Sequence, residues 1–182
     1  MAVIAPPYRA LVQTAAGTGM RWGELAGLQR DRLDLLRRRL EVTQTLVDVN
    51  GVLSFGEPKM PRSRRYVSLP PSLVTVPARH LEGHQHELVF TSETGDPLRR
   101  SNFHARVWRP ATTAAGLDSA PHFHDLRHSH VAMLISAGAP VKAIQHRLGH
   151  SSIVRTMDRY GHLLAEVDDD LIAGLEAQLS GS

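Results

Sequence analysis

The chain of 182 residues is long enough for one ordinary domain, and it contains no cysteine, which excludes a disulfide scaffold, a thiolate zinc site and a cysteine nucleophile. Its 21 basic and 18 acidic residues give a net charge of only +3, which names no partner. The distribution says more, because residues 1–110 carry 16 basic and 10 acidic side chains, whereas residues 111–182 carry 5 and 8. A basic front and an acidic end favour a polyanion as the partner.

Most of the sequence shows the spacing of apolar residues that is typical of helices, with proline at helix starts and glycine at helix ends. The first helix begins at Pro6 and ends near Gly17, and Ser101 is the predicted N-cap of a later one. The predicted helices cover, in chain order, residues 6–18, 21–28, 71–81, 101–115, 124–137, 140–149, 152–160 and 166–179.

A small sheet is predicted between the second and the third of these helices. Residues 40–47, 52–55 and 66–69 alternate or are rich in β-branched side chains, and Asn50-Gly51 is a typical hairpin turn. The apolar segment at residues 88–90 is expected to be buried. The predicted fold class is therefore mainly α with a small three-stranded antiparallel β-sheet.

The segment TGMRWGEL, residues 18–25, places Arg21 just after a glycine break at a predicted helix start. Backbone N–H groups and a guanidinium can converge there on one anion. The alternative is an exposed arginine paired with Glu24, which lies three residues later on the same helix face.

The basic loop GEPKMPRSRR, residues 56–65, contains Lys59, followed by Arg62, Arg64 and Arg65. Lys59 is one of only two lysines among the 21 basic residues, so its presence in this arginine-rich chain is informative. A lysine on a loop can contact a phosphate or donate a proton to a leaving oxygen. The alternative is a solvated run of charges.

The segment HFHDLRHSH, residues 122–130, allows three interpretations. His124 and His128 lie one helical turn apart with Asp125 between them, as in zinc metalloprotease helices, although that pattern needs a glutamate. His124 and Arg127 also share a helix face and would present an imidazole and a guanidinium to one phosphate. The third interpretation is a helix with exposed histidines, and the segment alone does not choose among them.

The segment LGHSSIVRTMDRYGH, residues 148–162, begins where Gly149 ends a predicted helix and exposes His150. Tyr160 follows ten residues later. A tyrosine hydroxyl is a poor nucleophile unless neighbouring groups stabilise the charge that develops. Arginine, lysine and histidine side chains would do so, and they would also stabilise a pentacoordinate phosphorus. The alternative is a half-buried tyrosine packed in a helix.

Taken together and in this order, TGMRWGEL, PKMPRSRR, HFHDLRHSH, LGHSS and MDRYGHL resemble the catalytic domain of the tyrosine recombinase (phage integrase) family. Each segment alone is weakly specific, but five in order across residues 17–162 are highly specific. The resemblance implies site-specific DNA recombination, by strand cleavage and rejoining through a 3′-phosphotyrosyl intermediate. It implies no metal, no ATP and no other cofactor, because the phosphotyrosine bond conserves the energy of the phosphodiester.

The resemblance also implies a role for each residue of the motifs. The implied assignments are Arg21 and Arg127 as the clamp on the scissile phosphate, Lys59 as proton donor to the leaving 5′-oxygen, His124 as general acid/base, His150 as a hydrogen-bond donor to the phosphate, Tyr160 as the nucleophile, Glu24 and Asp125 as supporting residues, and Arg62, Arg64 and Arg65 as contacts to the DNA backbone.

The implied partners are double-stranded DNA attachment sites, with a homo-tetramer on DNA and a monomer without it. Residues 166–182, a predicted C-terminal helix and tail, would contact a neighbouring subunit, and the alternative is that this helix packs on its own domain. The family's N-terminal core-binding domain is missing from residues 1–182, so we expect a single catalytic domain that is an excised domain, a truncation or a remnant. No apolar run is long enough to span a bilayer and no secretory signal is visible, so a cytoplasmic location in a bacterium is expected.

Three alternatives stay open. An inactive remnant would act only as a DNA-binding module, with salt-sensitive binding and no cleavage. A zinc hydrolase would use His124 and His128, but it leaves Arg21, Lys59 and Tyr160 unexplained. A type IB topoisomerase would share the phosphotyrosine chemistry, although the segments around His124 and LGHSS favour the recombinase.

Overall fold

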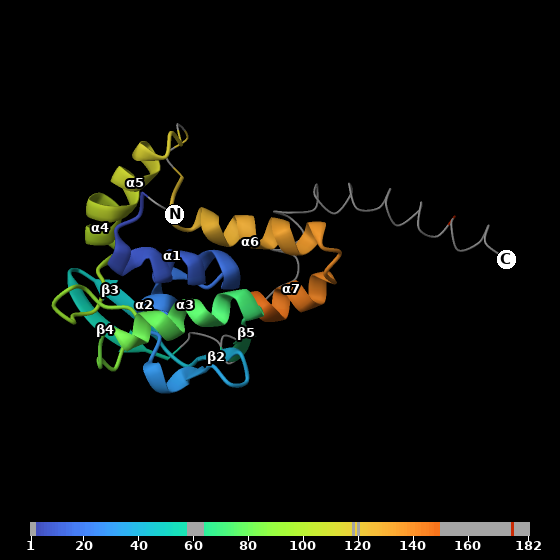
Figure 1. Ribbon diagram of the computed structural model, residues 1–182, viewed down its shortest axis with the longest axis horizontal. Coiled ribbons are helices and arrows are strands. Elements are labelled where there is room, and N and C mark those ends of the chain that lie inside the picture. The colour runs from blue at the N-terminus through green and yellow to red at the C-terminus, as the bar shows by residue number, and fades with distance from the viewer. Residues whose placement is uncertain (1–2, 58–63, 118, 120, 150–175, 177–182) are drawn as a thin grey trace.

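The computed structural model describes residues 3–57, 64–117, 119, 121–149 and 176. These residues form a helical body with two small antiparallel sheets (Figure 1). The predicted helices at residues 152–160 and 166–179 lie outside the described residues, apart from Glu176. The prediction of a mainly helical fold with a small antiparallel sheet component is confirmed.

The elements follow one another in an order close to the predicted one. The helices are α1 (Pro6–Thr18), α2 (Trp22–Ala26), α3 (Pro71–Glu82), α4 (Arg100–Phe103), α5 (Arg109–Ala114), α6 (Asp125–Ser136) and α7 (Val141–Leu148), with a 3₁₀ turn η1 (Arg30–Arg32) and a π-helical segment η3 (His104–Trp108). The strands are β1 (Leu33–Asp34), β2 (Arg39–Val42), β3 (Thr45–Val49), β4 (Val52–Gly56) and β5 (Arg65–Ser68). In this part of the chain, no helix is long and apolar enough to cross a membrane.

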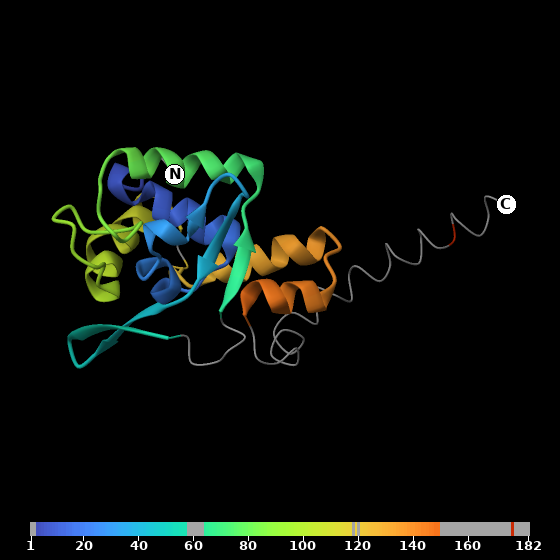
Figure 2. The same cartoon turned by 90° about the horizontal axis from the view of Figure 1, so that it is seen from below.

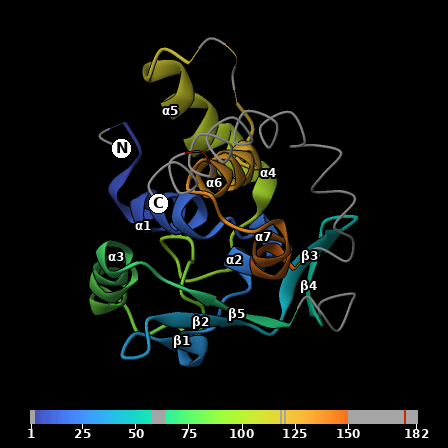
Figure 3. The same ribbon diagram turned by 90° about the vertical axis from the view of Figure 1, so that its right-hand side faces the viewer.

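Helix α1 is central and packs against both α3 and α6 (Figures 1 and 3). It has proline in its first turn and ends where Gly19 takes a left-handed φ of 65°. Its buried face contributes Leu11 and Val12 to the main core, to which the predicted buried segment adds Val89 and Phe90. A second, smaller core lies between α6 and α7 and consists of Val131, Ile135, Ile144 and Leu148.

The strands form two sheets, ordered β1-β2-β5 and β3-β4, so the single three-stranded sheet expected from the sequence is wrong in detail. The predicted strand at residues 40–47 divides after Val42 into β2 and β3. The cause is a close contact between β3 and α2, in which a Cβ on Gly23 would lie 2.6 Å from the Leu46 carbonyl oxygen. The Gln44 amide also donates to the Gly27 carbonyl at 2.9 Å. Both contacts hold β3 on α2 and separate it from β2.

The predicted hairpin turn at Asn50-Gly51 is confirmed. Both residues have positive φ, 52° and 82°, and they connect β3 to β4, with Val49 paired to Val52. Figure 2 shows this hairpin extending away from the helical body.

The long helix predicted over residues 101–115 begins earlier and is not uniform. Its N-cap is Arg99, so the prediction that Ser101 is the N-cap is wrong, and the π-helical segment η3 separates α4 from α5. Pro110 lies in the first turn of α5. A proline ring clashes with the carbonyl four residues earlier in a regular α-helix, so the wider π turn in front of it relieves that clash.

Candidate active site

Arg21 and His124, two of the residues assigned to catalysis, are the N-cap residues of α2 and α6. The residues beside them in the sequence pack together, because the Trp22 and Phe123 rings meet edge to face with centroids 5.2 Å apart. The Phe103 ring contacts both, at 4.9 Å and 5.4 Å. This aromatic cluster fixes the spacing between the two helix starts, and with it the spacing between Arg21 and His124.

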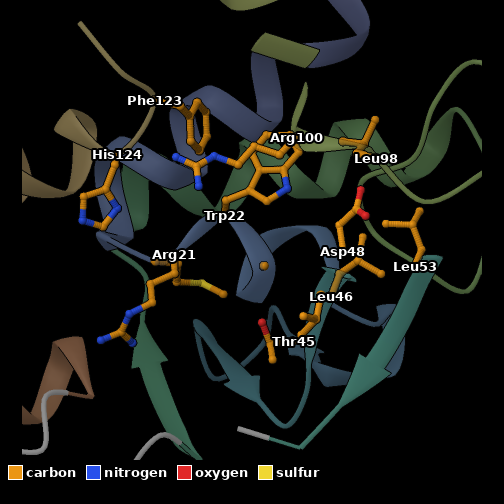
Figure 4. Close-up of a pocket in the computed structure, with 13 residues that line it drawn as sticks. Arg21, Trp22, Thr45, Leu46, Asp48, Leu53, Leu98, Arg100, Phe123 and His124 are labelled. Carbon is orange, nitrogen blue, oxygen red and sulfur yellow. The ribbon is translucent and has the colours of Figure 1, made fainter. Parts of the chain in front are cut away.

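Arg21 and His124 line a cavity of about 450 Å³, which continues along α2 to the β3–β4 hairpin. Arg100, an exposed residue of α4, lines it too, although no motif assigned it a role. Figure 4 shows the Arg100 guanidinium extending toward Phe123, at the same end of the cavity as His124. Two arginines and a histidine therefore line one open cavity, which is an arrangement that attracts anions.

The imidazole of His124 is held in its neutral form. Burial lowers its pKa, and the neighbouring His128 and the guanidinium groups of Arg127, Arg21 and Arg100 lower the pKa further. The His124 and His128 rings lie edge to face with centroids 4.9 Å apart. A histidine whose pKa lies below its usual value near 6.5 is neutral at physiological pH and can accept a proton.

Arg127 lies in the interior of the molecule, close to Arg21. It is buried, and its guanidinium donates from Nη1 to the Gly19 carbonyl and from Nη2 to the Leu148 carbonyl at 2.8 Å. Arg21 Nη1 donates to the same Leu148 carbonyl at 3.4 Å. Leu148 is the last residue of α7, so its carbonyl lies at the negative end of the helix dipole, where cations are stabilising. The end of α7 thus brings the two arginines together.

Glu24 holds Arg21 at two points. Its Oε2 accepts the Arg21 backbone N–H at 2.9 Å, and its Oε1 accepts Arg21 Nη1 at 3.0 Å. On the other side, Arg65 donates from Nη1 and Nη2 to the two oxygens, each at 3.0 Å. Burial raises the pKa of Glu24, but the hydrogen bond and charge of Arg65, followed by those of Arg21, outweigh it and hold the pKa below its ordinary value. Glu24 is therefore an ionised carboxylate between two arginines.

The structure corrects the expectation that Arg65 contacts the DNA backbone. Its side chain is only 1% exposed, and in addition to Glu24 it reaches the Arg147 carbonyl, to which Nε donates at 2.7 Å. Arg64, beside it, is exposed. Burial alternates along β5, with Arg65 and Val67 inside. The period of two, counted back from the apolar Val67, is a signal in the sequence that Arg65 faces the interior.

His130 and Arg147 are two further residues at this site to which the motifs assign no role. His130 is buried, with Nδ1 2.9 Å from the Ala16 carbonyl and Nε2 2.9 Å from Arg147 Nε. Arg147 also donates to the carbonyls of Ser68 and Gly17, each at 3.1 Å. These bonds join α6, α7, β5 and the end of α1 next to the Leu148 carbonyl that Arg21 and Arg127 contact.

Of the remaining assigned residues, the structure describes Asp125. Asp125 Oδ2 accepts the His122 backbone N–H at 2.7 Å in the turn before α6. Within the described ranges, no group of three or more His, Cys, Asp or Glu side chains could hold a metal ion, so the His124–His128 pair lacks a third ligand there. The assigned residues outside the described ranges are Lys59, Arg62, His150 and Tyr160.

The geometry sets the chemistry that this site can perform. Arg21 and Arg65 share one carboxylate, Glu24, and Arg127 donates to the Leu148 carbonyl beside them, so positive charge is in excess around the end of α7. A phosphate is the ligand whose oxygens match several guanidinium groups. The neutral imidazole of His124 adds a group that can move a proton.

Comparison with known proteins gives a consistent result. The model of a family described as the phage integrase family matches residues 3–166. A putative prophage phiRv2 integrase of Mycobacterium tuberculosis is 35% identical over 180 residues, which cover 96% of this chain and 47% of that protein. The chain thus spans about half the length of the curated relatives it matches.

Two solved structures share the fold. The Tn1549 transposon integrase, in complex with circular intermediate DNA, superposes with a TM-score of 0.75 at 23% identity, covering 83% of this chain and 54% of that one. A lambda integrase, solved as a tetramer bound to a Holliday junction, superposes with a TM-score of 0.57 at 22% identity, covering 81% and 42%.

Proposed function

The chain belongs to the phage integrase family, and from that membership we propose that it cleaves and rejoins DNA at specific sites through a 3′-phosphotyrosyl intermediate on Tyr160. The observation that carries the proposal has two parts: Arg21 and the neutral His124 line one cavity, and the buried Arg127 donates to the same Leu148 carbonyl as Arg21. Arg21 comes from a segment far in the sequence from the one that holds His124 and Arg127, and each of the three was assigned to catalysis from its motif.

Cleavage is a transfer of one phosphoryl group from DNA to protein. The Tyr160 hydroxyl oxygen attacks the phosphorus, the bond from phosphorus to the 5′-oxygen breaks, and a 3′-phosphotyrosine and a free 5′-hydroxyl form. The tyrosine proton passes to His124, whose lowered pKa keeps its imidazole ready to accept it. Lys59 supplies the proton that the leaving 5′-oxygen takes up.

Arg21 and Arg127 stabilise the charge that develops on the phosphate oxygens during this transfer. Guanidinium groups fixed in a site partly closed to water act there without reorganising, which is the largest single contribution in many enzymes. Arg100 adds a third positive charge beside the cavity and would contact a neighbouring phosphate of the same strand. His150 directly follows Gly149, at the end of α7 on which the clamp converges, and would donate a hydrogen bond to the phosphate.

Rejoining reverses these steps with a different strand. A 5′-hydroxyl attacks the phosphotyrosine, Tyr160 leaves as its phenolate and recovers a proton, and a phosphodiester forms. Each step exchanges one phosphate ester for another, so the number of ester bonds stays constant and no external energy source is required. The arginines and the lysine take the part that a metal ion plays in other phosphoryl transfers.

The proposed partner is double-stranded DNA carrying attachment sites, on which four copies of the chain assemble. Both of the solved structures compared above are complexes with DNA, and one of them is a tetramer bound to a Holliday junction. The excess of basic residues in the first 110 positions gives the charge that a DNA duplex would attract. Arg62 and Arg64 are proposed contacts to its backbone.

The proposal is tested by trapping the covalent intermediate. The chain is incubated with a pool of nicked suicide duplexes whose central segment is randomised, and protein–DNA adducts are separated under denaturing conditions and sequenced. We expect an adduct at a defined sequence for the wild type and none for Tyr160→Phe. The matched control is Tyr66→Phe, which removes the hydroxyl of an exposed tyrosine on β5 and should leave the adduct unchanged.

Two outcomes contradict the proposal. An adduct that persists in Tyr160→Phe shows that another residue is the nucleophile. Salt-sensitive DNA binding without any adduct in the wild type indicates a DNA-binding module instead.

A further inference from the structure

We propose that Arg65 is a positioning residue for Arg21, acting through Glu24. We also propose that it sets the position of Arg21 relative to Arg127 in the phosphate site. The inference rests on the proposed function, because it concerns how the site for the scissile phosphate is held. Arg21 lines the cavity with a side chain that is 40% exposed, whereas the Arg65 side chain lies behind it and is 1% exposed.

The first step of the argument is the orientation of the Glu24 carboxylate. Each of its oxygens accepts one hydrogen bond from Arg65 and one from Arg21, all between 2.9 Å and 3.0 Å. A guanidinium that donates two parallel bonds fixes the plane of a carboxylate, which a single donor does not. Arg65 thus sets the direction in which Glu24 offers its remaining acceptor sites to Arg21, to both its backbone N–H and its side chain.

The second step is the position of Arg65 itself. It begins β5, where it pairs with Val42 of β2, and its Nε donates to the Arg147 carbonyl at 2.7 Å. Arg147 precedes Leu148, whose carbonyl receives Arg21 and Arg127. One side chain therefore connects α2, β5 and the end of α7, and a shift of Arg65 would move both arginines of the clamp relative to each other.

The third step is the choice of side chain. Arg65 makes bonds in two directions, with its Nη atoms toward Glu24 and its Nε toward a carbonyl. A lysine ammonium carries the same charge but lacks the planar fork, so it cannot align both carboxylate oxygens and also reach the carbonyl. The Arg65→Lys substitution therefore keeps the positive charge beside Glu24. It removes the two parallel bonds to the carboxylate and the bond to the Arg147 carbonyl.

The test measures single-turnover adduct formation on the suicide substrate for Arg65→Lys, Glu24→Gln and the double variant. We expect each single variant to form the adduct about 100-fold more slowly, as for a reacting group displaced by roughly 1 Å. The final adduct yield and the DNA dissociation constant should not change. The double variant should be no slower than the slower single variant, because both substitutions break the same chain of contacts.

The control substitution is Arg39→Lys. Arg39 lies on β2 and pairs with Ser68, at the opposite end of the β2–β5 ladder from Arg65. Its guanidinium forms an ion pair with Asp34. The Arg39→Lys substitution should leave the rate constant of adduct formation unchanged. This control separates the loss of a guanidinium in this sheet from the loss of the contact with Glu24.

A second measurement does not depend on activity. The backbone N–H of Arg21 is bonded to Glu24 Oε2, whereas that of Gly27, in the same helical segment, is bonded to the Gly23 carbonyl. In Arg65→Lys we expect amide hydrogen exchange at Arg21 to become about tenfold faster, as for the loss of one hydrogen bond, with exchange at Gly27 unchanged.

The outcomes separate this inference from the proposed function. If the wild type forms no adduct, the proposed function fails, and the exchange at Arg21 still tests the inference. If the rate constant and the exchange at Arg21 are both unchanged in Arg65→Lys, the inference is overturned. A weaker DNA affinity with an unchanged rate constant also overturns it, because that pattern belongs to a residue that contacts DNA.

Discussion

At the scale of single residues, the hydrogen bonds of His130 determine where its proton lies. Nε2 accepts from Arg147 Nε, so Nδ1 carries the proton and donates to the Ala16 carbonyl. A second proton would break the bond to Arg147 and place two cations side by side. Burial, and then the charge of Arg147, accordingly lower the pKa of His130 to about 4.

We expect His130 to make the stability of the protein depend on pH. Its pKa in the folded state is below the unfolded value of 6.5, so its contribution is complete above pH 6.5 and is lost as the pH falls toward 4. Between about pH 7.5 and pH 5 this residue alone should lower the free energy of unfolding by about 2 kcal/mol. Urea unfolding at the two pH values measures this change.

The control for this prediction is His130→Gln. The variant should be less stable than the wild type at both pH values, because it loses buried hydrogen bonds. Between the two pH values, its free energy of unfolding should nevertheless fall by about 2 kcal/mol less than that of the wild type. An equal pH dependence in the two proteins would show that another group titrates.

The arginines show how far residue identity can be predicted from the sequence. The motifs selected Arg21 and Arg127, and the structure brings both to the Leu148 carbonyl. They also grouped Arg64 with Arg65, although Arg64 is exposed and Arg65 is buried at the start of β5. The partners of His130 and Arg147 could not be predicted, because backbone carbonyls at the end of α1 leave no trace in the sequence.

At the scale of elements, the end of α7 requires glycine for two reasons. Gly149 has a left-handed φ of 63°, and a Cβ there would lie 2.9 Å from Nη1 of Arg65. We expect Gly149→Ala to lower the free energy of unfolding by about 2 kcal/mol, from the strained backbone and the displaced guanidinium together. The displaced Arg65 should also slow adduct formation. Thermal unfolding and the suicide-substrate assay measure the two effects.

Gly138 provides the matched control, because it follows α6 with a φ of 70°, and a Cβ added there would meet no atom of the described residues within 4 Å. Gly138→Ala should cost only the backbone strain, about 1 kcal/mol, and leave the cleavage rate unchanged. Equal effects of the two substitutions on the cleavage rate would show that a Cβ at residue 149 does not act by displacing Arg65.

Elements with strong local signals were predicted, and those that depend on distant contacts were not. The helices at residues 6–18 and 124–137 have clear starts and ends, and the structure has α1 and α6 there. The break between β2 and β3 arises from the close approach of β3 to α2 at Gly23, which is a tertiary contact. The two-residue strand β1 is too short to show alternation.

At the scale of the whole molecule, we expect a monomer in solution without DNA. The exposed large apolar side chains of the described residues are dispersed, apart from Val49, Val52 and Phe55 on the β3–β4 hairpin, and dispersed side chains do not make a stable interface. Sedimentation should show one chain alone and four chains on a Holliday junction. A tetramer that forms without DNA and does not depend on concentration would contradict this prediction.

The contacts of the clamp also constrain how the protein folds. Arg21 reaches a carbonyl 127 positions away, and Arg127 reaches one 108 positions away. Contacts of this separation close large loops and form late relative to local helices. A nascent chain that has not yet released α7 from the ribosome therefore cannot bring the two arginines together, so this pair of contacts forms only when nearly all of residues 3–149 has been translated.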